Sequence, residues 1–215
     1  MLIIGAKGFA KEVLEVVNES DEIDNLVFYD DISESVDNIL FNRFPILRNR
    51  EEASNYLKKI DNRFTLGIGN PLLRKKLYQV FKDLGGVFTS TISTKSNIGN
   101  YDINVGVGSN ILAGSTISNS VTIGMGVILY YNSVVTHDCI IGDFVEISPG
   151  ATILGRSKIS DYCQVGANST ILPDLNIGTN VIVGAGAVVT KDIPDNSIVV
   201  GIPGKIIKEL PSLNF

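Results

Sequence analysis

The chain has 215 residues, of which 44% are hydrophobic and 19% charged, and its net charge is −5. The apolar fraction suffices for a buried core, while the acidic balance argues against a surface for nucleic acid or for anionic membranes. With one histidine and two cysteines outside any CxxC spacing, a disulfide scaffold, a zinc ribbon and a metal centre of several imidazoles are excluded, so no metal is expected.

The first 88 residues alternate short apolar runs with helical patterns. The predicted strands are residues 2–4, 26–29, 64–68 and 87–89, and the predicted helices are residues 9–17, 51–60 and 71–84. This alternation predicts a small parallel sheet of the Rossmann-like α/β type. No basic segment precedes the first apolar run and no run approaches the ~20 residues of a spanning helix, so we expect a soluble, cytoplasmic protein.

Three polar or glycine-rich segments follow the first three predicted strands. Gly5 and Gly8 frame the first turn, where the backbone can approach a ligand and helix N–H groups attract an anion. The turn lacks the third glycine of a dinucleotide fingerprint, and alone it is equally consistent with a turn that binds nothing. Asp30-Asp31 and Gly69-Asn70 lie at the same sheet edge, where open α/β sheets bind ligands, so the three segments together favour a mononucleotide site.

A six-residue period governs the chain from residue 105 onward. Every sixth residue is aliphatic: Val105, Ile111, Ile117, Ile123, Leu129, Val135, Ile141, Ile147, Ile153, Ile159, Val165, Ile171, Ile177, Val183 and Val189. With small or β-branched residues four positions later, the pattern resembles the hexapeptide repeat [LIV]-[GAED]-x-x-[STAV]-x of left-handed parallel β-helices. Three hexads then close one triangular coil, and residues 105–194 form five coils. The register slips once, between Ile98 and Val105, where we expect a bulge.

The repeat places the rare residues of the chain. Cys139 and Cys163 occupy the small inward position, so we interpret them as buried packing rather than reactive thiols. His137 falls on an outward corner beside Asp138, and taken alone it can also be a solvated corner histidine. Gly155 lies one coil further along the chain. Because glycine has no side chain, we expect an open space above the His137 ring in which part of a ligand could lie.

Five segments together resemble a known family over nearly the whole chain. They are IIGAKGFAKEV at 3–13, FYDD at 28–31, LGIGNPLLRKKL at 66–77, THDCIIGDF at 136–144 and GIPGK at 201–205. These segments are similar to those of the bacterial sugar acyltransferases of the sialic acid O-acetyltransferase and UDP-4-amino-sugar N-acetyltransferase type. The resemblance implies a nucleotide-sugar-binding domain over residues 1–88 and a left-handed β-helix with a C-terminal cap over residues 89–215. It also implies a homotrimer that binds acetyl-CoA between the prism-shaped β-helices of neighbouring chains.

The resemblance also implies roles for individual residues. His137 would be the general base and Asp138 would tune its basicity. The nucleotide-sugar site would comprise Lys7, Gly8, Phe9, Asp30, Asp31 and Gly69. The acetyl-CoA contacts would comprise Glu146, Ala167 and Ala185. The coil spacing adds Gly155 to this set, with its N–H as a candidate donor to the oxyanion. The sequence departs from the family at Lys7, Phe9 and Glu146, where relatives often carry glycine, histidine and histidine.

Three functions remain open at this point. The first is acetyl transfer to the amino group of a UDP- or dTDP-linked 4-amino-sugar. The second is O-acetylation of a sialic acid or another sugar hydroxyl, with the same fold and base. The third is a non-catalytic trimeric scaffold that binds nucleotide sugars, against which the outward His137-Asp138 pair argues.

Overall fold

The computed structural model describes residues 1–20, 23–33 and 38–213, and it divides into two compact units, Met1–Thr94 and Lys95–Phe215. The sequence-based boundary at 88/89 lies six residues earlier. The first unit extends further because Ser93 and Thr94 are fastened to its first helix. The Glu19 carboxylate accepts from Ser93 Oγ at 2.7 Å and from the Thr94 amide at 2.9 Å.

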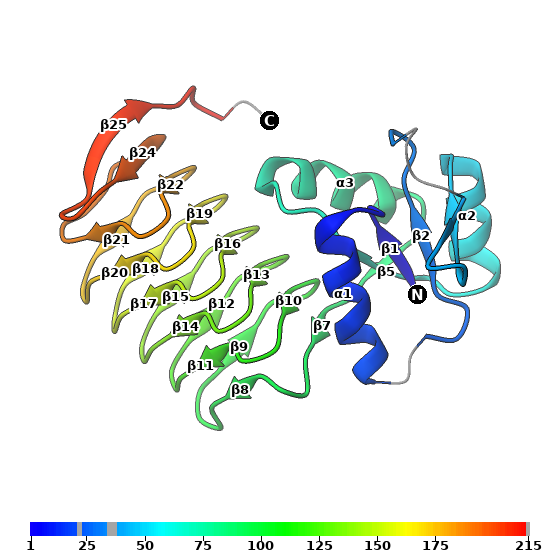
Figure 1. Cartoon of the computed structure of the whole chain (residues 1–215), viewed down its shortest axis with the longest axis horizontal. Coiled ribbons are helices and arrows are strands. Elements are labelled where there is room, and N and C mark those ends of the chain that lie inside the picture. Colours follow the sequence, from blue (N-terminus) through cyan, green and yellow to red (C-terminus); the bar gives the residue numbers. More distant parts are fainter. Residues whose placement is uncertain (21–22, 34–37, 214–215) are drawn as a thin grey trace. The chain divides into compact units, whose positions relative to one another are not determined.

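The first unit is a six-stranded sheet with helices in its crossovers (Figure 1). Its elements are β1 (Leu2–Ile4), α1 (Gly8–Glu19), β2 (Val27–Tyr29), β3 (Ile39–Leu40), β4 (Phe44–Leu47), α2 (Arg50–Lys59), β5 (Arg63–Leu66), α3 (Pro71–Asp83) and β6 (Val87–Phe88), followed by the short β7 (Thr91–Ile92). The strand order is β3-β4-β2-β1-β5-β6, and every pair is parallel except the β3–β4 hairpin. The predicted Rossmann-like sheet is therefore confirmed, with β3 and β4 added to it.

The second unit is a left-handed β-helix of two-residue strands. They are β8 (Asn97–Ile98), β9 (Asn104–Val105), β10 (Asn110–Ile111), β11 (Thr116–Ile117), β12 (Thr122–Ile123), β13 (Ile128–Leu129), β14 (Val134–Val135), β15 (Ile140–Ile141), β16 (Glu146–Ile147), β17 (Thr152–Ile153), β18 (Lys158–Ile159), β19 (Gln164–Val165), β20 (Thr170–Ile171), β21 (Asn176–Ile177), β22 (Ile182–Val183) and β23 (Val188–Val189). From β9 onward, each strand pairs in parallel with the strand one coil, or 18 residues, away, as in Ile128↔Glu146, and the coils stack visibly in Figure 1. The first strand, β8, pairs with β11 at a spacing of 19 residues. The predicted fold is confirmed.

The interior of the prism explains why the period is so strict. From Ile111 to Val189 the hexad aliphatics are at most 1% exposed and form one continuous core. Inward hydroxyls are satisfied by corner carbonyls, as where Ser157 Oγ donates to Leu172 O at 2.9 Å. Both cysteines are buried in this core, and burial raises the pKa of the Cys163 thiol to about 12. Thiolates are therefore scarce at neutral pH, as expected for packing residues.

The two ends of the prism are irregular. Residues 99–103 form the expected bulge, in which Tyr101 is 73% exposed. At the other end β24 (Ser197–Val200) pairs with β22, and β25 (Lys205–Glu209) folds back antiparallel on β24. Asn180 Nδ2 donates to the carbonyl of Pro211, which holds the tail over the last coil. No helix in the described residues is long and apolar enough to cross a bilayer.

Candidate functional site

A cavity of about 350 Å³ lies at the carboxyl ends of β1, β2 and β5. Its lining includes all six residues expected at a nucleotide-sugar site: Lys7, Gly8, Phe9, Asp30, Asp31 and Gly69. The structure adds lining residues that were not expected to bind the substrate: Tyr29, Ile32, Ser33, Ile68, Leu73 and Leu77. Leu73 and Leu77 lie about one turn apart on α3.

The turn between β1 and α1 offers backbone donors to this cavity. Gly5 has φ +105°, and a Cβ on it would lie 2.8 Å from the Gly67 carbonyl oxygen, so the turn accepts only glycine there. Helix α1 has no side-chain cap, whereas Asn49 caps α2 and Asn70 caps α3. An uncapped helix N-terminus has N–H groups available to an anion, which is the requirement for a diphosphate.

The two aspartates after β2 shape the opposite rim. Asp30 Oδ1 accepts from the amides of Ile32 and Ser33, at 3.2 and 2.9 Å, and so closes a tight turn. Asp31 Oδ2 accepts from the Tyr29 hydroxyl at 2.8 Å. Burial, followed by this bond to Asp31, raises the pKa of Tyr29 to about 12, so the phenol remains a donor. The second oxygen of each carboxylate can accept from a base N–H or a ribose hydroxyl.

His137 and Asp138 form a pair on the corner between β14 and β15. His137 Nδ1 lies 2.7 Å from Asp138 Oδ2, and the two side chains are 54% and 52% exposed. Because an ionised carboxylate only accepts, the bond places the proton of the neutral ring on Nδ1. Nε2 then carries a lone pair and can take a proton from a substrate.

Gly155 contacts the imidazole directly. A Cβ on Gly155 would lie 2.6 Å from His137 Cε1 and 2.7 Å from Nε2, closer than any real contact. The expectation of an open space for part of a ligand is therefore wrong in this respect, because the ring itself fills the space beside Gly155.

The backbone N–H of Gly155 differs from the capped amides of another corner of the β-helix. At Met125 and Asp143 the amide donates to an aspartate one coil further, at 2.8 and 2.7 Å. The residue one coil beyond Gly155 is Pro173, whose side chain has no acceptor. The Gly155 N–H thus receives no such cap. Because Gly155 itself lies beside the ring, its N–H is a candidate donor to a developing oxyanion.

An ion pair that the sequence analysis missed stacks on the same corner. Arg156 and Asp174 follow Asp138 at intervals of 18 residues, and they are joined at 2.5 Å (Nε–Oδ1) and 2.7 Å (Nη2–Oδ2). The hydrogen bond from Arg156 lowers the pKa of Asp174. The spacing of 18 residues per coil is the sequence signal that could have placed Arg156 and Asp174 beside His137.

The remaining expected acetyl-CoA residues lie elsewhere on the prism. Glu146 stands in β16, where its carboxylate accepts from Gln164 Nε2 at 3.1 Å. Ala167 and Ala185 occupy the corner that follows β19 and β22, one coil apart. A single chain therefore does not bring these three residues together with His137.

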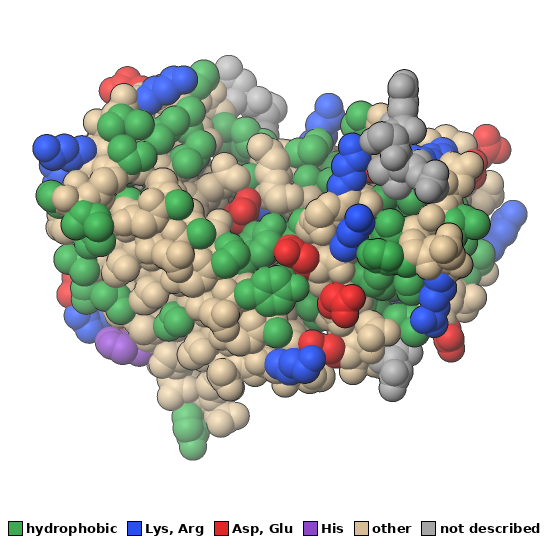
Figure 2. All heavy atoms as spheres, viewed as in Figure 1, with side chains coloured by type: hydrophobic (Ala, Val, Ile, Leu, Met, Phe, Trp, Pro, Cys, Tyr) green, Lys and Arg blue, Asp and Glu red, His purple; other side chains and the backbone are tan. Residues whose placement is uncertain are grey.

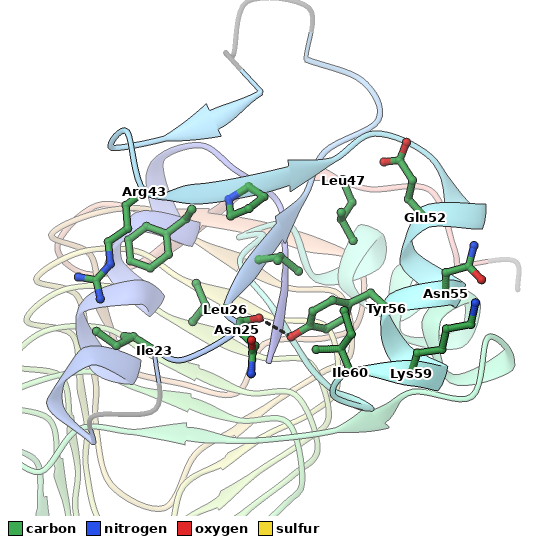
Figure 3. A pocket seen from close by; sticks show the side chains of 13 residues that line it. Ile23, Asn25, Leu26, Arg43, Leu47, Glu52, Asn55, Tyr56, Lys59 and Ile60 are labelled. Atoms are coloured by element: carbon green, nitrogen blue, oxygen red, sulfur yellow. Dashed lines mark hydrogen bonds between the residues drawn. The ribbon is translucent and has the colours of Figure 1, made fainter.

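The first unit has a second cavity, of about 720 Å³, between α2 and the amino ends of β2 and β4 (Figure 3). Leu26, Leu47, Tyr56 and Ile60 contribute to its walls, and the Tyr56 hydroxyl donates to the Asn25 carbonyl at 2.6 Å. It contains none of the residues expected to bind substrate. We therefore assign the candidate site to the smaller cavity and the His137 corner.

Comparisons with known proteins agree with both halves of this architecture. Residues 1–81 match the PglD N-terminal domain, and residues 120–155 and 156–191 match the bacterial transferase hexapeptide (six repeats) model. The search of curated proteins finds no match.

Solved structures resemble nearly the whole chain. PerB from Caulobacter crescentus, solved with CoA and GDP-perosamine, is 27% identical over 96% of both chains, with a TM-score of 0.89. The acetyltransferase domain of PglB from Neisseria gonorrhoeae is 27% identical, covering 96% of this chain and 98% of that one, with a TM-score of 0.86. WeeI from Acinetobacter baumannii is 31% identical, with the same coverage and a TM-score of 0.84. The chain therefore belongs to the bacterial sugar acyltransferases that join a PglD-type N-terminal domain to a left-handed β-helix of hexapeptide repeats, and it is an acyltransferase.

Proposed function

We propose that the protein transfers an acetyl group from acetyl-CoA to the amino group of a nucleotide-linked 4-amino-sugar. The observation that carries the proposal is the pairing of His137 with Asp138 beside the uncapped amide of Gly155. The relatives support it, because PerB is solved with CoA and a nucleotide sugar, and the PglB domain with acetyl coenzyme A. The family resemblance suggests UDP or dTDP as the carrier of the sugar, and the complex of PerB with GDP-perosamine adds GDP.

In direct transfer each of these groups would have one role. Asp138 holds the Nδ1 proton, so Nε2 of His137 takes a proton from the sugar amine as its nitrogen bonds to the thioester carbonyl carbon. The Gly155 N–H donates to the carbonyl oxygen as it becomes an oxyanion. When the tetrahedral intermediate collapses, the C–S bond breaks and imidazolium returns the proton to the departing thiolate of CoA.

The decisive experiment compares acceptors. We would follow CoA release with 4-amino-sugars linked to UDP, dTDP and GDP and with free sialic acid, and locate the acetyl group by mass spectrometry. Acetylation of the amine of a nucleotide sugar is expected. Acetylation of only a hydroxyl on a free sugar would instead identify an O-acetyltransferase.

A homotrimer is expected because one chain separates the proposed acetyl-CoA residues from the base. Acetyl-CoA lying between neighbouring prisms would contact Ala167 and Ala185 of one chain and His137 of the next. Tyr130 and Leu154 remain partly exposed and can be buried at such an interface, whereas Leu112, at first sight also an outward residue, is fully buried within the chain. Light scattering should give three times the chain mass of 23.2 kDa. A monomer at micromolar concentration would contradict the shared site.

Removing the rim carboxylates should weaken binding of the nucleotide sugar without slowing the chemistry. We expect the double variant Asp30→Ala/Asp31→Ala to raise its KM by about tenfold or more, with a much smaller change in kcat. Tyr29→Phe is the matched control, since it removes the hydroxyl bonded to Asp31 but leaves both carboxylates. Steady-state kinetics with each substrate varied would show the split, and a fall in kcat with constant KM would contradict this role.

A further inference from the structure

Arg74 is the only Lys, Arg, Asp or Glu that is buried among the described residues, with 1% of its surface exposed. It is the fourth residue of α3, and its amide donates to Asn70 O at 3.0 Å in the first helical turn. The side chain folds back over that turn, and Nη1 donates to the carbonyl oxygen of Gly69. Burying a guanidinium is costly unless its bonds have a purpose in the fold or the site.

The segment that Arg74 holds is a wall of the proposed nucleotide cavity. Gly67, Ile68 and Gly69 all line it, and Arg74 itself does not. Two of these three residues are glycines, so side-chain packing does little to fix their peptide planes. On the strand side, the Gly67 amide donates to Ile4 O at 2.7 Å. On the helix side, the bond from Arg74 fixes the carbonyl of Gly69.

The direction of that carbonyl matters for an anionic ligand. Because Arg74 lies outside the cavity lining, a Gly69 carbonyl bonded to it points behind the wall. If the bond were lost, the peptide could rotate and turn its oxygen toward the space beside the α1 N-terminus. A carbonyl dipole facing a diphosphate is repulsive, whereas the same change affects an uncharged nucleoside much less.

We propose that Arg74 is a positioning residue of the nucleotide site, which keeps the Gly69 carbonyl turned away from the diphosphate. This inference rests on the proposed function, because it assumes that the cavity binds a nucleoside diphosphate moiety. Arg74 acts through Gly69 and takes no part in acetyl transfer.

Titration calorimetry on the full chain tests the proposal, with UDP, dTDP and GDP and the matching nucleosides as probes. Arg74→Met keeps the length and bulk of the side chain but removes the donor. We expect it to raise the Kd of the diphosphate that the wild type binds best by about tenfold or more, and that of the nucleoside by less than about threefold. In kinetics, the KM for the nucleotide sugar should rise while kcat and the KM for acetyl-CoA stay unchanged.

Three further variants separate positioning from general support of the fold. Arg74→Lys keeps a donor and should restore part of the affinity. Lys76→Met removes the same charge from an exposed position of α3 and should bind like the wild type. If Arg74→Met fails to fold, Arg74→Gln carries the test, and it should also lose affinity for the diphosphate, because its shorter amide does not reach Gly69.

The outcomes are distinguishable. Wild-type affinity for the diphosphate in a folded Arg74→Met or Arg74→Gln variant would overturn the role of Arg74 while leaving the nucleotide site intact. An equal loss for diphosphate and nucleoside, together with raised KM values for both substrates, would show a merely structural role. Failure of the wild type to bind any of the three diphosphates would overturn the nucleotide site itself and the present inference with it.

Discussion

His137→Ala is expected to fold normally and to lose about 10²- to 10⁴-fold in kcat, the usual contribution of a general base. Folding should be unaffected because the ring stands on an outward corner, is 54% exposed and lies next to a glycine. Turnover should fall because His137 is the only histidine of the chain, so no second imidazole can take the amine proton. Steady-state kinetics with saturating nucleotide sugar and acetyl-CoA would measure the loss, and circular dichroism would check the fold.

Asp138→Asn is the matched control for this variant. An asparagine oxygen can still accept from Nδ1–H, so the ring keeps its orientation while the negative charge is lost. We therefore expect a smaller loss of kcat than for His137→Ala. A His137→Ala enzyme within about threefold of the wild type would rule out general-base catalysis by this residue.

The sequence predicted the β-helix well because its core is encoded locally. One aliphatic residue per hexad fills the prism, and each such residue needs only its neighbours one coil away, so a period of six fixes strand, corner and register together. The corner position of His137 and its spacing to Gly155 follow from the same count. The ligand-binding edge of the sheet in the first unit could also be predicted from the sequence, because the carboxyl ends of parallel strands meet at one edge.

Other features depend on contacts that a sequence period does not predict. The β3–β4 hairpin contains Pro45 within a strand and turns at Phe41 and Asn42, both with positive φ, so neither strand nor turn chemistry marked it. Leu112 stands at an outward position of its hexad, yet it is fully buried. Arginine on a helix usually lies in solvent. Only the three-dimensional structure shows that Arg74 is buried and donates to the carbonyl of Gly69.

Gly155→Ala is expected to lower kcat by about tenfold to a hundredfold without changing the backbone. Its Cβ would enter the imidazole, at 2.6 Å from Cε1 and 2.7 Å from Nε2, so the ring must swing away from its position beside the Gly155 amide. Misplacing a catalytic group by about 1 Å can cost a factor of about 10². Kinetics with both substrates varied should show the loss in kcat, whereas an arm of acetyl-CoA lying over Gly155 would instead require a raised KM for acetyl-CoA.

The β-helix provides the control for this substitution. Ala167 and Ala185 occupy the equivalent hexad position at another corner, so alanine fits the corner backbone. The three atoms nearest to a Cβ at residue 155 all belong to the His137 ring. In a His137→Ala background the clash disappears. Adding Gly155→Ala to that variant should therefore cost no stability in thermal denaturation, while the same change in the wild type should cost up to about 1 kcal/mol. An equal loss of stability in both backgrounds would mean that the backbone conformation requires glycine at residue 155. The contact between Gly155 and the imidazole would then have no role in catalysis.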